Sequence, residues 1–155
     1  MLHTLQTKPA LPFIRMMSSS TVQPGTSATA SLAVKTSGLA SAIPLDTQQD
    51  AFPKVFATAR LVALMEIAGA RTLKPLLQPG QQSVGVSIDM THSSPTPLDA
   101  EVTAEATYRG REEKLHVFDV VARNKGGEVG KPVHRRAIVD AERVEQGVKK
   151  RAEVA

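Results

Sequence analysis

The feature that most limits the fold of this chain is a single apolar helical run, followed only by strand patterns. Over residues 58–73, apolar side chains recur at three- and four-residue spacing, at Leu61, Leu64, Met65 and Ala68. Pro75 and the Pro-Gly pair at 79–80 predict the end of this helix. A protein with one long helix of this kind must bury it against sheet.

Alternating apolar and polar residues predict strands on both sides of the helix. One strand precedes it and four follow, at 27–35, 83–91, 102–108, 115–122 and 133–139. Turn signals at Arg109-Gly110-Arg111 and Lys125-Gly126-Gly127 separate the later strands, which we expect to pair as a meander. The fold class is therefore α+β, with a long central helix wrapped by a curled antiparallel sheet of about five strands. Such wrapping would explain a helix that is apolar nearly all round.

The length of 155 residues predicts one domain. We expect a flexible N-terminal segment over 1–25, the folded domain over 26–145 and a polar C-terminal tail over 146–155. The first 45 residues contain no Asp or Glu, which is typical of an organelle transit peptide. Pro9 and Pro12 would break the amphipathic helix of such a peptide, so a disordered tail is an equal alternative.

Composition argues against several classes of protein. Cysteine is absent, and the four histidines lack metal-ligand spacing, so we expect no metal site and no cofactor. With no Trp and one Tyr, the chain lacks the aromatic platform on which single-stranded nucleic acids stack. No apolar run is long enough to cross a bilayer. We expect an intracellular protein, cytoplasmic first and mitochondrial as the alternative, without nucleic-acid or membrane partners.

Glu66 is the residue in the apolar helix that most needs an explanation. Burying an unpaired carboxylate costs several kcal/mol, so it must lie on a polar edge, be paired or be used chemically. His92, at the end of the next predicted strand, is the candidate partner, and Thr58 lies two turns earlier, about 80° away around the helix. Each residue also has a structural interpretation: a helix cap for Thr58, an ion pair with Arg71 for Glu66 and a turn position for His92.

Three runs of sequence carry a family resemblance. VFATARLVALMEIAGARTL, PGQQSVGVSIDMTHSSPTP and HRRAIVD resemble the fluoroacetyl-CoA-specific thioesterase-like family, a branch of the hot-dog fold, over roughly residues 27–145. The resemblance implies a catalytic Thr, Glu and His, an oxyanion-site glycine, an arginine near the last strand and an aromatic that closes over the acyl pocket. These positions fall on Thr58, Glu66, His92, Gly85, Arg136 and Phe52.

The resemblance implies an acyl-CoA thioesterase that releases a short or small acid, with coenzyme A as part of the substrate. It also implies a homodimer with clefts between subunits. Glu66 would attack the carbonyl or activate water, His92 would carry protons, and the Gly85 N–H would meet the oxyanion. Arg136 would contact coenzyme A or form an ion pair. Arg60 and Ile67 stand where the family tends to carry aromatic residues, and Ala59 follows the threonine. The resemblance therefore does not identify the acyl group of the substrate.

Two other functions are weighed against this one. A hot-dog hydratase would carry an Asp-x-Asn-Pro-x-His run, which is missing, because the single asparagine is Asn124 in a predicted turn. A non-catalytic acyl-CoA binding or sensing module is the alternative function. It would keep the cleft but would not need Glu66 and His92 together.

Overall fold

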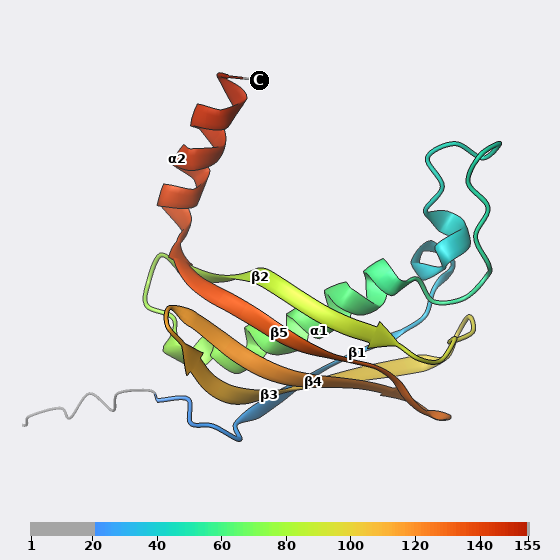
Figure 1. Cartoon of the computed structure of the whole chain (residues 1–155), viewed down its shortest axis with the longest axis horizontal. Helices are drawn as coiled ribbons and strands as arrows, with labels where there is room; N and C mark the ends of the chain where they lie inside the picture. Colours follow the sequence, from blue (N-terminus) through green and yellow to red (C-terminus); the bar gives the residue numbers. More distant parts are fainter. Residues whose placement is uncertain (1–20, 155) are drawn as a thin grey trace, which may run out of the picture.

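The computed structural model describes residues 21–154, so most of the expected N-terminal segment lies outside the described residues. Five strands curl around one long helix, and a second helix projects from the body (Figure 1). The predicted helix is confirmed at the predicted residues. The elements are β1 (Ser27–Ala33), α1 (Thr58–Leu73), β2 (Gln81–His92), β3 (Glu101–Glu112), β4 (Leu115–Asn124), β5 (Gly127–Asp140) and α2 (Ala141–Ala152).

The sheet order is β1-β3-β4-β5-β2, with every pair antiparallel. The expected four-strand meander is therefore wrong: β3, β4 and β5 form one, but β2 pairs with β5 instead of β3. Alternation of apolar residues determines which side chains share a face, and it carries no information about which strand is the neighbour. This arrangement leaves β2 at one edge of the sheet, beside α1.

The turn predicted at 109–111 is also wrong. β3 continues through Gly110 with a bulge there, where φ is 131°, and the chain turns at Glu113 and Lys114. A glycine with positive φ suits a bulge as well as a turn, so the Arg-Gly-Arg run alone could not distinguish them. The turn predicted at 125–127 is confirmed between β4 and β5.

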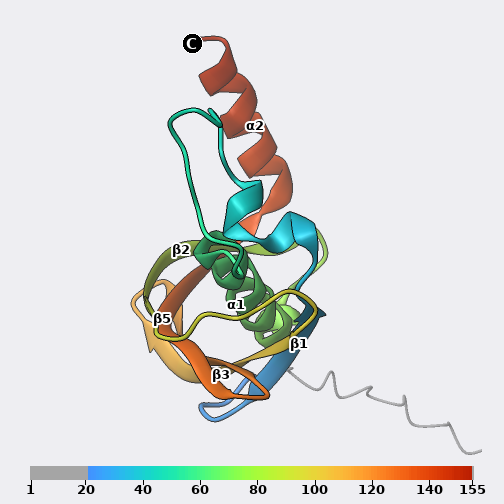
Figure 2. The ribbon, with the colours of Figure 1, turned by 90° about the vertical axis from the view of Figure 1, so that its right-hand side faces the viewer.

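The core lies between α1 and the concave face of the sheet (Figure 2). Seven residues of α1 are buried, and the helix packs mainly on β3 and β1, whose core side chains are small or branched, among them Ala30, Val102 and Ala104. The opposite side of α1 is uncovered, with Ala63 exposed and Ile67 at 46% exposure. The helix is thus apolar on a side that the sheet of its own chain does not reach.

The edge strand β2 exposes two apolar side chains, Val84 at 37% and Val86 at 53% exposure. The expected boundary at 145/146 falls inside α2, none of whose residues is buried. In both views, α2 and the segment between β1 and α1 project from the side of the molecule where β2 lies (Figure 1 and Figure 2). No helix among residues 21–154 has the length and apolar character needed to cross a membrane.

Candidate functional site

Thr58 and His92 form a hydrogen-bonded pair. Thr58 is the first residue of α1 and His92 is the last residue of β2, so the start of the helix and the end of the strand meet there. Thr58 Oγ1 lies 2.9 Å from His92 Nδ1. His92 Nε2 is buried and has no hydrogen-bond partner in the described part of the chain. A hydroxyl and an imidazole at this distance have the geometry of a nucleophile and its base.

The Thr58–His92 pair lines a cavity of about 350 Å³. Its wall includes Phe56, which is 1% exposed, and the turn that follows His92. Phe52, the aromatic expected to close over the acyl pocket, is 50% exposed in the segment before α1. Its neighbour Pro53 lines the cavity, so the segment carrying Phe52 borders this pocket. Closure by Phe52 itself stays a prediction.

Glu66 lies in a separate cluster on the same helix. Eight residues separate it from Thr58, which is about 12 Å along the helix axis. Its side chain is 42% exposed, and Oε1 lies 4.0 Å from Arg136 Nη1. Gly85 of β2 lies against the carboxylate so closely that a Cβ there would overlap Glu66 Oε1. A glycine at this position allows the helix carboxylate to rest on the strand.

Arg136 is buried beneath this carboxylate, at 4% exposure. Its Nη2 donates to the Ser83 carbonyl oxygen at 2.8 Å, Nε donates to Ser83 Oγ at 3.2 Å and Nη1 donates to the Glu66 carbonyl oxygen at 3.2 Å. Nη1 also lies 3.0 Å from His134 Nε2. Burial lowers the pKa of Arg136, and the Glu66 carboxylate opposes that effect. The contact with Glu66 fits the ion-pair interpretation, and a contact with coenzyme A stays a prediction.

One chain therefore brings the predicted residues together in two groups. Thr58 and His92 form one, and Glu66, Gly85 and Arg136 form the other. No hydrogen bond between Glu66 and His92 occurs among the described residues, so the partnership expected from the sequence is not formed within a chain. The pairing with Arg71 is not formed either, because the Arg71 guanidinium donates to the Thr29 carbonyl oxygen at 2.7 Å.

Sequence reasoning did not assign roles to Ser83 and His134, which hold Arg136. The HRR run already placed His134 and Arg136 on one face of a strand, and that spacing was the available signal. The Ser83 contacts had no signal, because they depend on β2 pairing with β5.

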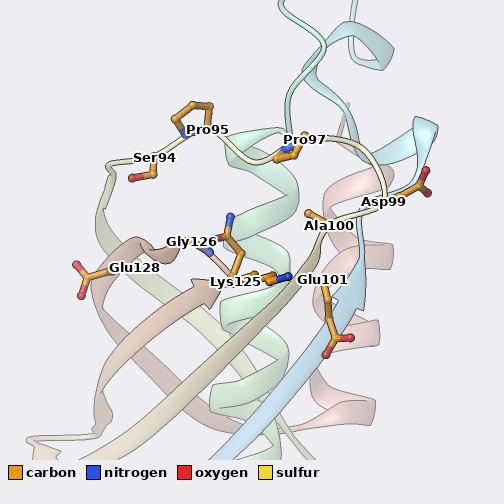
Figure 3. Close-up of a pocket in the computed structure, with 10 residues that line it drawn as sticks. Ser94, Pro95, Pro97, Asp99, Ala100, Glu101, Lys125, Gly126 and Glu128 are labelled. Carbon is orange, nitrogen blue, oxygen red and sulfur yellow. Dashed lines mark hydrogen bonds between the residues drawn. The ribbon is translucent and has the colours of Figure 1, made fainter.

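A larger cavity, of about 680 Å³, lies between the loop after β2 and the β4–β5 turn (Figure 3). Its charged lining residues are Asp99, Glu101, Lys125 and Glu128. It includes none of the predicted site residues, but it shares Ser94 and Pro95 with the wall of the smaller cavity. The smaller cavity is the one lined by predicted site residues, Thr58 and His92. Among the described residues, no group of three His, Asp or Glu side chains is arranged to bind a metal ion.

Comparisons with known proteins agree on one family. The family model described as fluoroacetyl-CoA-specific thioesterase matches residues 41–142. A fluoroacetyl-CoA thioesterase from Streptantibioticus cattleyicolor is 37% identical over 100 residues, which cover 64% of this chain and 72% of that protein.

Solved structures give the same result. A structure of the fluoroacetyl-CoA thioesterase FlK aligns with a TM-score of 0.77 at 32% identity, covering 83% of this chain and 96% of that one. A thioesterase superfamily member from Thermus thermophilus aligns with a TM-score of 0.76 at 22% identity, covering 87% of this chain and 98% of that one, which supports the fold alone. The chain adopts the hot-dog fold and belongs to the fluoroacetyl-CoA-specific thioesterase family.

Proposed function

We propose that this protein hydrolyses the thioester of a small acyl-CoA, using the Thr58–His92 pair and the Glu66 carboxylate. The observation that carries the proposal is the 2.9 Å hydrogen bond between Thr58 Oγ1 and His92 Nδ1 beside a cavity. The family supplies the reaction class, since the thioesterase from Streptantibioticus cattleyicolor and FlK are both named for thioester hydrolysis. No cofactor is needed, because coenzyme A enters as part of the substrate.

His92 is the proposed proton carrier. If the Thr58 hydroxyl donates to Nδ1, the imidazole takes that proton as Thr58 attacks the carbonyl, the thiolate leaves, and water then hydrolyses the ester formed on Thr58. If Nδ1–H donates instead, Nε2 takes a proton from the water that attacks the carbonyl directly. Either route transfers a proton to His92, which then protonates the departing thiolate. Glu66 would contribute a carboxylate that stabilises the imidazolium or orients water, and the Gly85 N–H would meet the oxyanion.

The two groups of residues require a second subunit to meet. A two-fold axis that crosses α1 near Val62 and β2 near Ile88 would place Thr58 and His92 opposite the partner subunit's Glu66 and the partner subunit's Gly85. The spacing along both elements allows one axis for both pairings, because Val62 lies midway between Thr58 and Glu66 and Ile88 lies near the middle of the span from Gly85 to His92. An isologous interface has this reciprocal form. We propose a homodimer with two composite sites.

The exposed surfaces support this dimer. Exposed apolar side chains occur on both elements that would meet at the proposed axis: Ala63 and Ile67 on the uncovered side of α1, and Val84 and Val86 on β2. An unpaired edge strand of 12 residues offers backbone hydrogen bonds to a second copy. The edge also lies between the two projecting segments seen in Figure 1, so a partner would be flanked on both sides. Joining two edges would remove this exposed apolar surface from water.

The acyl group is proposed to be small, because the substrate named for the relatives carries a small acyl group. We do not extend the proposal to fluorine. By the family resemblance, Arg60 and Ile67 stand where aromatic residues are expected, and Ile67 follows Glu66 directly, where it would alter the wall of an interfacial pocket.

The test is thiol release from a panel of short, branched, aromatic and halogenated acyl-CoAs. Wild type is compared with Glu66→Gln and with Glu145→Gln, which changes an exposed carboxylate on α2. Turnover lost only in Glu66→Gln supports the assignment, and full turnover in that variant refutes the role of Glu66. Absence of turnover on every substrate, with coenzyme A still bound, would indicate the alternative function, an acyl-CoA binding module.

A further inference from the structure

The side chain of His134 is fully buried between β2 and α1, and the proposed chemistry does not use it directly. Its two ring nitrogens both have partners: Nδ1 lies 2.9 Å from the Ser87 carbonyl oxygen, and Nε2 lies 3.0 Å from Arg136 Nη1. We propose that His134 is a positioning residue that holds the Arg136 guanidinium against Glu66. This inference rests on the proposed function and assigns His134 a role within that site.

The partners determine the protonation state of His134. A carbonyl oxygen only accepts, so Nδ1 carries the proton; a guanidinium only donates, so Nε2 is the acceptor. An imidazolium would place an N–H donor against an Arg136 donor and add a second positive charge beside the first. Burial lowers the pKa of His134, the Ser87 hydrogen bond raises it and the nearby Arg136 charge lowers it, while Glu66 raises it. His134 therefore acts as a neutral acceptor.

This acceptor sets the orientation of the guanidinium. Nη1 is the arginine nitrogen that faces Glu66: it donates to the Glu66 carbonyl oxygen and lies 4.0 Å from Oε1. His134 Nε2 bonds this same Nη1, whereas Ser83 bonds the other two nitrogens. Ser83 alone would fix the far side of the planar group. The His134 contact fixes the side that determines where the positive charge lies relative to the carboxylate.

The surrounding backbone holds the pair in place. A Cβ at Gly69 of α1 would lie 3.1 Å from His134 Cδ2 and 3.2 Å from Arg136 Cδ, so the helix backbone rests directly on both side chains. A register shift in β2 separates Gly85 from Ser87, and the His134 hydrogen bond anchors the carbonyl of Ser87 at this irregularity. His134 thus ties together α1, Arg136 and the strand segment that carries Gly85.

Two substitutions separate these hydrogen bonds. Gln places a terminal amide near the position of Nε2, so His134→Gln can keep an acceptor for Arg136 while losing the Ser87 bond. Asn places its amide near Nδ1, so His134→Asn can keep the donor to Ser87 while losing the acceptor. A hydrogen bond to a charged group is stronger than one between neutral groups, and only His134→Asn loses the acceptor for Arg136. We therefore expect kcat to fall about tenfold or more in His134→Asn and about threefold or less in His134→Gln.

Three measurements distinguish positioning from packing. His134→Asn and His134→Gln should lower the thermal stability by similar amounts, and in both KM should change less than kcat. Phe118→Leu alters a ring whose centroid lies 6.3 Å from that of His134, and it should lower stability without lowering kcat of the folded enzyme. The guanidinium resonances of Arg136, assigned with Arg136→Lys, should retain separate Nη signals in His134→Gln and lose them in His134→Asn.

Equal losses of kcat in His134→Asn and His134→Gln, or unchanged Arg136 resonances in His134→Asn, would overturn the proposal. The resonance measurement does not need turnover. If wild type hydrolyses no thioester while the Arg136 signals respond as expected, the proposed function fails and the positioning contact stands. If turnover is normal and the Arg136 signals do not respond, the positioning role fails alone.

Discussion

Replacing Gly85 by alanine is the most direct perturbation of the candidate site. Gly85 lies in β2 directly against Glu66, and its φ is not in the left-handed region, so alanine can adopt the backbone conformation. A Cβ would lie 3.0 Å from Glu66 Cδ, closer still to Oε1, and 3.4 Å from His134 Cε1. The methyl group meets the Glu66 carboxylate before anything else, so activity and stability should respond differently.

The size of the effect follows from these distances. To reach ordinary van der Waals contact, Oε1 must retreat by about 1 Å or more. A misplacement of that size costs on the order of 10²-fold in rate when the group acts on the substrate. The stability cost is small, because the 42% exposed Glu66 side chain can turn toward water and because Gly→Ala at a compatible position gains about 0.4–1 kcal/mol through the unfolded state. We expect a net stability change within about 1 kcal/mol.

The assay is kcat/KM for thiol release beside urea unfolding of the same preparation. Gly147→Ala is the matched control: Gly147 lies in exposed α2 with no atom within 4 Å of an added Cβ, and alanine there should gain up to about 1 kcal/mol without changing turnover. Wild-type turnover in a folded Gly85→Ala would refute the argument that Glu66 must rest on the strand. A large loss of stability would show instead that the carboxylate cannot move aside.

Three further predictions follow from the same structure. Thr58→Ala removes the hydroxyl bonded to His92, so kcat should fall: nearly to background if Thr58 is the nucleophile, and by less than in Glu66→Gln if water is. Thr58→Ser should restore most of the activity, and equal rates in wild type and Thr58→Ala would contradict a role for the pair. Val86→Glu on the β2 edge should give a folded protein that is a monomer by light scattering and shows little turnover by thiol release. Val148→Glu on exposed α2 should leave the oligomeric state and the turnover unchanged, and a stable Val86→Glu dimer would argue against this interface. Burial lowers the pKa of both His116 and His134, so below the ordinary histidine pKa of about 6.5 the unfolded chain binds protons that the native protein does not. The free energy of unfolding should therefore fall as the pH is lowered from 7.5 to 5.5, by up to about 1.4 kcal/mol per pH unit for each histidine. A free energy of unfolding in urea that stays constant over this range would contradict the prediction.

The helix and the strands were predictable because their signals are local. Three- and four-residue spacing predicted the residues of α1, and alternation predicted the position of each strand. β5 begins at Gly127, earlier than the predicted residue 133. The same local signals could not show that β2 pairs with β5 or that Gly110 forms a bulge. Strand neighbours are chosen by packing across the whole sheet, and a glycine with positive φ serves a bulge and a turn equally.

The candidate site divides in the same way. The candidate residues could be named from the sequence: Glu66 because a carboxylate in an apolar helix needs an explanation, and Gly85 and Arg136 because of the family resemblance. Its partner was not evident: His92 bonds Thr58, and Glu66 lies against Gly85 and Arg136. Helix geometry separates Thr58 and Glu66 by about 12 Å along the axis, so two residues on the same helix can belong to different clusters.

The sequence by itself determined the fold class and the extent of the long helix, because these depend on periodicity and on side-chain type, and its resemblance to the family supplied the candidate site residues. Only the tertiary structure decided the sheet order, the burial of Arg136 with His134 and the division of the site residues into two clusters. These depend on contacts between residues far apart in the chain. Their distances are set by packing α1 into the curled sheet, which no local pattern encodes.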